Sequence, residues 1–157
     1  GPAQAINVGD GMHAMARLAL LRLLNRGVSV TKTFRAVHML DEASLQTCEG
    51  RFLDLEAQGA RMDGLSVNEY LTMSNGKTGA MFSCAMGLGG LLATDDTCTI
   101  GALEECGSKL GLAIQISRDI VDLWGDGTDQ RIADDDLRWY SHRDQYRPGN
   151  ARCDDHG

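Results

Sequence analysis

The amino-acid sequence predicts an all-α fold, and three observations predict it. Apolar residues recur near the helical period of 3.6 over long runs, and helix start or stop signals separate these runs. No segment alternates with a period of two, and no Asn-Gly turn lies between β-branched runs. With 157 residues, 43% of them apolar, the chain is long enough to form one domain. We expect about four main helices followed by an irregular tail.

The first predicted helix runs from Gln4 to Asn25, and Gly27 follows at the position of a helix stop. Its apolar residues lie nearly all round the helix, which indicates that the helix is buried. These residues are Met12, Met15, Ala16, Leu18, Ala19, Leu20, Leu21, Leu23 and Leu24.

The second run continues through Gln58, and Gly59 ends it. Its apolar residues recur at intervals close to the helical period, which favours one long helix or two helices in line. They are Phe34, Val37, Leu40, Leu45, Cys48, Phe52 and Leu55.

The third run has the clearest start signal of the chain. Ser66 followed by Glu69 forms the pattern of a capping box, and Leu65 is placed to act as a hydrophobic staple. The run extends toward Ala93 and contains several glycines, which weaken a helix unless another backbone or a ligand must come close. These are Gly76, Gly79, Gly87, Gly89 and Gly90.

The fourth helix is expected to begin at Asp96 or Thr97 and to end near Trp124. The apolar side chains that it should bury are Ile100, Leu103, Leu110, Ile114 and Val121. The helical periodicity stops after Asp126. We therefore expect a helical domain over residues 1–126, and a loop and mobile tail over residues 127–157.

Composition argues against several classes of function. The net charge of −7 disfavours a protein that binds nucleic acid or an anionic membrane through a broad basic surface. Apolar runs are interrupted well before the length of a membrane span. The five cysteines are an odd number and include no CxxC pair, so we expect a cytoplasmic protein rather than a secreted disulfide framework.

One polar stripe on the fourth helix suggests chemistry. Gln115, Asp119, Asp122 and Asp126 are spaced three or four residues apart, so they share one side of a helix, and Arg118 falls within the same stripe. Carboxylate oxygens are hard ligands suited to Mg²⁺, which often shares its remaining positions with phosphate oxygens and water. A solvated acidic helix end would show the same spacing, so the stripe alone leaves both readings open.

Four segments in order make the pattern more specific: AINVGD (residues 5–10), CEGRFLDLE (48–56), EYLTMSNGKTGAMF (69–82) and GLAIQISRDIVDLWGD (111–126). Together they resemble the trans-polyprenyl diphosphate synthase family, the polyprenyl synthetases of isoprenoid synthase type I. The resemblance covers roughly residues 1–126 and matches the C-terminal part of that family's domain. It implies a helical bundle around a central cavity, in which Mg²⁺ ions bridge two Asp-rich motifs and the diphosphate of an allylic substrate.

The resemblance also implies roles for particular residues. Lys77 and Thr78 match the family's Lys-Thr pair, whose cation faces the substrate diphosphate, and Gln115 matches the Gln before the second Asp-rich motif. A lysine at that place stabilises the charge that develops on the departing diphosphate. We thus expect catalytic roles for Lys77, Thr78 and Gln115, substrate contacts from the same three residues and Arg118, and metal ligation by Asp119, Asp122 and Asp126.

Three departures from the family pattern suggest an incomplete or impaired site. The family's first Asp-rich motif lies upstream of AINVGD and is absent from this sequence. Arg118 stands where the second motif has its first Asp, and a guanidinium cannot ligate Mg²⁺. Arg118 could pair with Asp122 one turn on, or bind diphosphate directly. Arg51 replaces the family's Gln in EGRFLD, while Asp54 is kept. Without the resemblance, Asp54 would be interpreted as an ordinary surface carboxylate.

The resemblance implies a trans-prenyltransferase of isoprenoid biosynthesis. Such an enzyme condenses isopentenyl diphosphate with an allylic diphosphate through Mg²⁺-assisted ionisation. We expect the chain to form a homo-oligomer such as a dimer, or to work with a partner chain that supplies the missing half. Two alternatives remain open: a non-catalytic partner subunit of a complete homologue, and a class I terpene cyclase.

Overall fold

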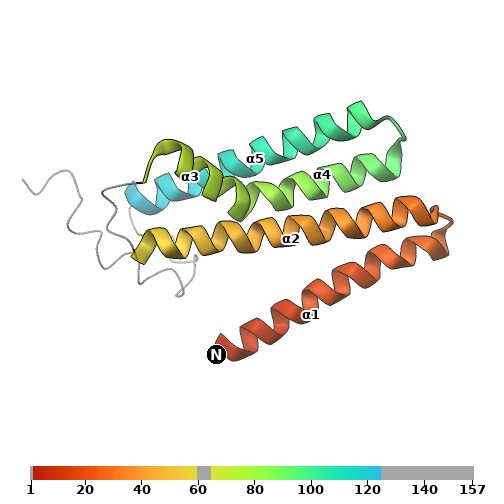
Figure 1. The fold of residues 1–157 in the computed structure, drawn as a ribbon, viewed down its shortest axis with the longest axis horizontal. Helices are drawn as coiled ribbons and strands as arrows, with labels where there is room; N and C mark the ends of the chain where they lie inside the picture. The colour runs from red at the N-terminus through yellow and green to blue at the C-terminus, as the bar shows by residue number, and fades with distance from the viewer. Residues whose placement is uncertain (1, 60–64, 125–157) are drawn as a thin grey trace, which may run out of the picture. The chain divides into compact units, whose positions relative to one another are not determined.

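The computed structural model describes residues 2–59 and 65–124, and over this part of the chain it contains helices and no strands (Figure 1). The predicted all-α class and the four main helices are confirmed. In chain order the elements are α1 (Pro2–Leu21), the 3₁₀ turn η1 (Arg22–Arg26), α2 (Val30–Gly59), α3 (Val67–Ser74), the π-helical turn η2 (Asn75–Gly79), α4 (Ala80–Ala93) and α5 (Thr97–Trp124). The predicted tail over residues 127–157 lies outside the described residues.

The chain divides into two compact units, Gly1–Ile116 and Ser117–Gly157. The first unit holds α1 to α4 and most of α5. Of the second unit, the structure describes only the last turns of α5, Ser117–Trp124. Each unit is described by itself, and the expected boundary after residue 126 stays a prediction.

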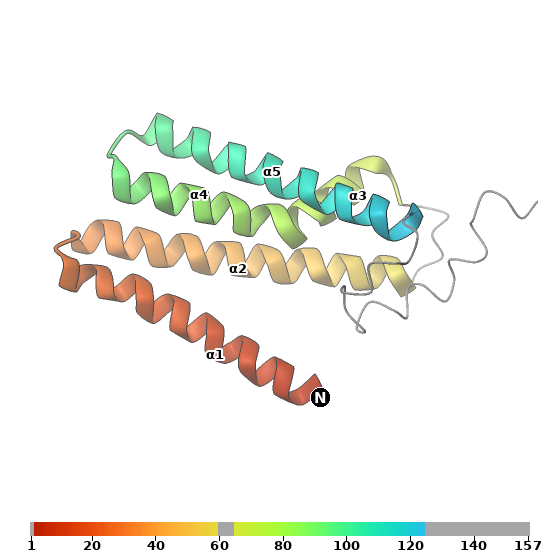
Figure 2. The ribbon, with the colours of Figure 1, turned by 180° about the vertical axis from the view of Figure 1, so that it is seen from behind.

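The prediction that the first helix is buried is wrong. Most side chains of α1 are exposed, with Met12 66% and Met15 70% accessible. Both views show α1 meeting α2 at the connecting turn and diverging from it toward the N-terminus (Figures 1 and 2). Gly27 ends η1 in a left-handed conformation with φ of 82°, which confirms the helix stop. Within the described residues, most large apolar side chains of α1 are therefore left uncovered, although His13 and Arg17 pair with Asp41 of α2 and Leu20 packs against the core.

Helix α2 is one continuous helix, which confirms the simpler of the two expectations. The side that it buries consists mainly of small residues rather than the large apolar ones. Ala36 packs with Leu91 and Ile100, while Leu40 and Ala43 pack with Cys84. Large apolar residues on the other sides of α2, including Phe34, Phe52 and Leu55, are exposed.

The third predicted run forms α3, η2 and α4 in succession. The capping box is confirmed, because the Ser66 hydroxyl accepts a hydrogen bond from the Glu69 amide, and the Glu69 carboxylate accepts one from the Ser66 amide. The Ser66 hydrogen bonds lower the pKa of Glu69. No helix in the described part of the chain is long and apolar enough to cross a membrane.

Helix α5 begins at Thr97 and ends at Trp124, as predicted. Asp96 caps it by accepting hydrogen bonds from the amides of Cys98 and Thr99. Ile100 is buried, but Leu110 and Val121 are exposed, so the expectation that they are buried is wrong. A periodic pattern shows which residues share a side of the helix, but not how much of that side another element covers.

Candidate functional site

Lys77 and Thr78 lie on the π-helical turn η2, between α3 and α4. The amide of Ala80 donates to the carbonyl of Asn75, five residues earlier, and such turns are rare and frequent at functional sites. Two glycine contacts hold the turn between neighbouring helices. A Cβ on Gly50 of α2 would lie 2.2 Å from the backbone nitrogen of Lys77. A Cβ on Gly111 of α5 would lie 2.8 Å from the Gly79 Cα. The backbone of the turn therefore touches α2 on one side and α5 on the other.

Lys77 pairs with Asp54 of α2 across this contact. The Lys77 Nζ atom donates a hydrogen bond of 2.7 Å to Asp54 Oδ2, and the side chains are only 24% and 18% exposed. A charge-assisted bond of this length between two half-buried side chains is strong for its class. Asp54 is therefore a specific partner of Lys77 rather than an ordinary surface carboxylate.

Thr78 bonds to the opposite neighbour, α5. Its hydroxyl donates a hydrogen bond of 2.6 Å to Gln115 Oε1, and Gln115 is 6% exposed. Because the Thr78 hydroxyl donates its hydrogen bond to Gln115, the Thr78 oxygen keeps lone pairs that can accept another hydrogen bond or face a positive charge. The structure thus brings together two of the residues that the sequence singles out, although 37 positions separate them.

A second polar bond supports the turn. The Ser108 hydroxyl of α5 donates to Asn75 Oδ1 at 2.7 Å, and the same Asn75 oxygen would lie 2.1 Å from a Cβ on Gly79. Asn75 and Ser108 are the supporting residues that sequence reasoning missed. Asn75 lies within the segment EYLTMSNGKTGAMF but was given no role, and Ser108 lies outside the four segments, whereas Asp54 carried one signal, its match to the family's Asp after the altered Gln.

The acidic stripe belongs to the second unit and to the residues beyond the described part. Arg118 is exposed on α5, while Asp119 and Asp122 are half-buried. No ion pair joins Arg118 to Asp122 in the described part of the helix, so the suggested one-turn salt bridge is not formed there. Asp126 lies outside the described residues. Within the described residues, no three His, Cys, Asp or Glu side chains are grouped closely enough to enclose a metal ion.

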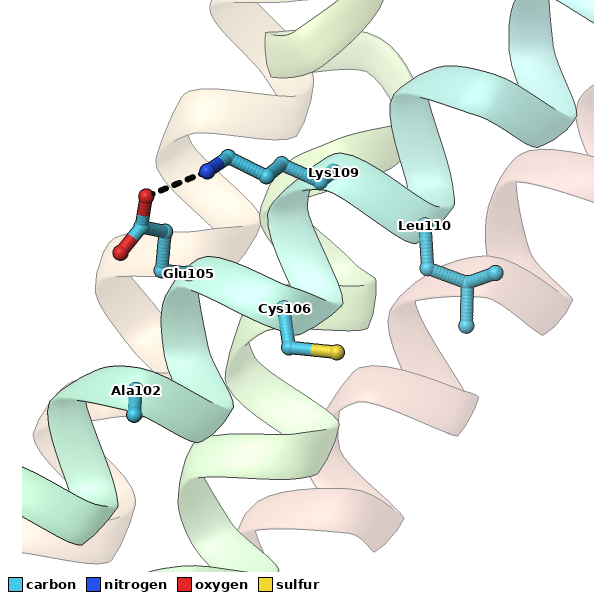
Figure 3. A pocket seen from close by; sticks show the side chains of 5 residues that line it. All are labelled: Ala102, Glu105, Cys106, Lys109 and Leu110. Carbon is cyan, nitrogen blue, oxygen red and sulfur yellow. Dashed lines mark hydrogen bonds and ion pairs between the residues drawn. The ribbon is translucent and has the colours of Figure 1, made fainter.

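A separate surface hollow lies along α5, with a volume of about 490 Å³ (Figure 3). Five residues of α5 line it, and Lys109 pairs with Glu105 at its edge. The pair raises the pKa of Lys109 and lowers that of Glu105. None of the residues expected at the site lines this hollow. The lining residues are Ala102, Glu105, Cys106, Lys109 and Leu110.

Comparisons with known proteins agree on one family. The family model for polyprenyl synthetases matches residues 1–139. Over 126 residues the chain is 40% identical to a geranylgeranyl diphosphate synthase of Mycobacterium tuberculosis, covering 80% of this chain and 34% of that protein. It is 32% identical to a short chain isoprenyl diphosphate synthase of Methanocaldococcus jannaschii, with 80% and 36% covered.

Solved structures give the same result. The crystal structure of a geranylgeranyl pyrophosphate synthase matches 75% of this chain and 34% of its own, with a TM-score of 0.66 at 30% identity. That of geranylgeranyl pyrophosphate synthetase from Pyrococcus horikoshii matches 63% and 30%, with a TM-score of 0.58 at 35% identity. The chain therefore spans about a third of the length of the relatives that it matches.

Proposed function

Because this chain belongs to the polyprenyl synthetase family, we propose that it carries the diphosphate-binding turn of a trans-prenyltransferase. The observation that carries the proposal is the π-helical turn that fixes Lys77 and Thr78 between α2 and α5. Relatives named as prenyl diphosphate synthases support an allylic diphosphate and isopentenyl diphosphate as the substrates.

In the proposed reaction, the bond between C1 of the allylic substrate and its diphosphate oxygen breaks, and diphosphate leaves with the electron pair. The double bond of isopentenyl diphosphate then attacks C1, and loss of a proton restores a double bond. The Lys77 ammonium would stabilise the charge that grows on the departing diphosphate. The Thr78 oxygen, whose proton is directed to Gln115, would face the positive charge left on the allylic carbon.

The metal part of the site is also a proposal. Two half-buried carboxylates, Asp119 and Asp122, lie three positions apart on α5, which fits Mg²⁺ shared with diphosphate oxygens and water. They would hold the ion, with Asp126 next in the same motif, and the bound ion would neutralise the diphosphate as it leaves. Arg118 replaces a carboxylate of this stripe and would bind a diphosphate oxygen directly through its guanidinium.

A second function, that of a non-catalytic partner subunit, is favoured by two observations. Arg118 removes one acidic ligand of the stripe, and the apolar residues of α1 are exposed and suited to cover by another polypeptide. We further propose that the chain acts in an assembly, as a homo-oligomer or with another polypeptide that covers α1. A cytoplasmic location stays a prediction that rests on the cysteine pattern.

The test is calorimetric titration of the purified chain with geranyl diphosphate, in Mg²⁺ and in EDTA. We expect binding in Mg²⁺ that Lys77→Ala weakens at least about tenfold, because the ammonium is lost from the diphosphate. Lys109→Ala is the matched control. Lys109 also pairs with a carboxylate, that of Glu105, but it is not one of the residues of the proposed site. The Lys109→Ala variant should bind geranyl diphosphate as tightly as the unaltered chain does.

Two further variants test the acidic stripe. Asp119→Ala should remove the Mg²⁺-dependent part of the affinity. Arg118→Asp should increase that part by adding a carboxylate to the stripe, and should weaken binding in EDTA because the guanidinium contact is lost. If geranyl diphosphate fails to bind under every condition, the diphosphate site is not functional in this chain. The partner-subunit proposal would then be preferred, and tight association with a complete homologue would support it.

A further inference from the structure

Asp54 and Arg51 lie on α2 beside the lysine of the proposed site, and we propose that they control its affinity for diphosphate. Asp54 is the internal counter-ion of Lys77 in the ligand-free chain, and Arg51 becomes the partner of Asp54 when a diphosphate takes Lys77. The inference rests on the proposed function, because it assumes that Lys77 binds diphosphate.

Asp54 cannot move away from Lys77 with its helix. The backbones of α2 and η2 touch at Gly50 and Gly76, where a Cβ on Gly76 would lie 3.1 Å from the Gly50 Cα. Helix α2 and the π-helical turn therefore stay at a fixed separation. Any change in the partners of Lys77 must come from side-chain rotation, and the Asp54 carboxylate remains within a few ångströms of whatever binds there.

Asp54 also sets the charge that an incoming anion meets at the turn. Asp54 neutralises Lys77 at a place where both side chains are mostly shielded from water, with 18% and 24% exposed. Charges interact more strongly where water is partly excluded, so a carboxylate there repels an incoming diphosphate more than a surface carboxylate would. The diphosphate must also compete with the existing 2.7 Å hydrogen bond for the lysine. Asp54 therefore lowers the affinity of the turn for anions.

Arg51 is placed to offset the competition between Asp54 and the diphosphate. Arg51 lies three residues before Asp54 on α2, so the two side chains leave the helix on the same side. Arg51 is exposed and forms no ion pair with another described residue. Its guanidinium stays charged at any accessible pH and matches a carboxylate in shape. The glutamine that the family has at this position carries no charge, so it would not neutralise Asp54 after Lys77 leaves.

The experiment measures binding of inorganic diphosphate in EDTA, so that no metal ion contributes. Asp54→Asn should tighten binding about tenfold, because the carboxylate no longer repels the ligand or competes for Lys77. Glu105→Gln is the matched control, since it removes the same charge from beside the exposed Lys109 and should leave the affinity unchanged. Asp54→Ala is measured alongside, so that a folding defect in one variant, seen by circular dichroism, does not remove the test.

Arg51→Gln separates an indirect from a direct role for the arginine. In the unaltered chain it should weaken binding about threefold, because Asp54 loses its alternative partner. In the Asp54→Asn background it should have no effect, since no carboxylate remains to be neutralised. Weakening in both backgrounds would mean that Arg51 contacts the diphosphate itself, which overturns its role as partner of Asp54.

The outcomes also separate this inference from the proposed function. If Lys77→Ala abolishes binding but Asp54→Asn and Asp54→Ala bind no more tightly than the unaltered chain, the site stands and the counter-ion role of Asp54 is wrong. If no variant, including Asp54→Asn, binds diphosphate in EDTA although the unaltered chain binds geranyl diphosphate in Mg²⁺, the proposed site stands and the inference is wrong. If neither ligand binds under either condition, the proposed diphosphate site is itself wrong and the inference falls with it.

Discussion

At the scale of residues, the site depends on two neighbours that bond in different directions. Lys77 reaches Asp54 on α2, and Thr78 reaches Gln115 on α5. Successive side chains leave a helical turn in different directions, so one short turn can bond to helices on two sides. The Lys-Thr pair is thus fixed from both sides before any ligand arrives, which reduces the cost of ordering it on binding.

A single cap controls the start of the helix that carries Gln115. Asp96 accepts hydrogen bonds from the Thr99 hydroxyl and from the amides of Cys98 and Thr99, and these bonds lower the pKa of its carboxyl group. Replacing it with alanine should lower the Tm by roughly 2–4 °C at neutral pH, because the amides at the helix start lose their acceptor.

The pH dependence of this effect follows from the lowered pKa. A carboxyl group whose pKa is depressed by folding stabilises the protein above its unfolded pKa, and this stabilisation is lost as the pH falls through the folded pKa. The Tm difference between the unaltered chain and Asp96→Ala should therefore be complete above about pH 5 and shrink below about pH 4. Asp96→Asn, which caps without titrating, should not show this pH dependence. If the Tm difference between the unaltered chain and Asp96→Ala does not change with pH, the ionised Asp96 carboxylate is not what stabilises the helix start.

At the scale of elements, the sequence predicted helix ends better than helix contacts. Helix ends depend on local signals, and Ser66 with Glu69, Gly27 and Asp96 acted as such signals. The π-helical turn could not be predicted, because a bond from residue i to i+5 has no characteristic residue pattern. The glycines of the third run suggested a close approach, but only the structure shows that Gly76 meets Gly50 of α2.

The same limit applies to the candidate site. Lys77, Thr78 and Gln115 could be singled out because they lie in motifs that resemble a known family. Lys77 pairs with Asp54 of α2, and Asn75 pairs with Ser108 of α5. Both partners come from helices distant in sequence, so these pairs depend on how the helices pack. Contacts between helices depend on the fit of whole surfaces, and no spacing within one helix contains that information.

The contact between α2 and η2 makes a prediction about stability. Gly50→Ala would place a Cβ 2.2 Å from the backbone nitrogen of Lys77, which no side-chain movement can relieve. We expect the free energy of unfolding to fall by about 1–3 kcal/mol, as in other overpacked interiors. Gly101→Ala on α5 is the matched control, because nothing lies within 4 Å of the added atom. It should raise the free energy of unfolding by about 0.5–1 kcal/mol, the usual gain of alanine over glycine in a helix.

Urea unfolding followed by circular dichroism measures both changes. The outcome that would contradict the close contact is a Gly50→Ala variant as stable as Gly101→Ala. A destabilised but folded Gly50→Ala chain should also bind inorganic diphosphate differently from the unaltered chain, since the added methyl group would displace the turn that carries Lys77.

At the scale of the whole molecule, the exposed apolar residues of α1 are the main departure from an ordinary surface. Scattered exposed apolar side chains are normal, but on α1 they follow one another along a whole helix, and α2 exposes further large ones. Burying one such side chain contributes roughly 1.5–3 kcal/mol. The gain from covering several of them is large compared with the total stability of a domain of this size. The exposed large apolar residues on α1 are Ile6, Val8, Met12, Met15, Leu18 and Leu21.

We therefore expect the chain to associate through α1 when no other polypeptide covers that helix. Sedimentation velocity over a range of concentrations should show a dimer or larger species. The double variant Met15→Lys/Leu18→Lys should shift the chain toward monomer, because each lysine must be desolvated when α1 is covered. Leu92→Lys on α4 is the control, since Leu92 is also exposed, at 43%, but lies on another helix. Equal loss of association in both variants would show that α1 is not the surface involved, and a monomer at every concentration would contradict the need for a partner.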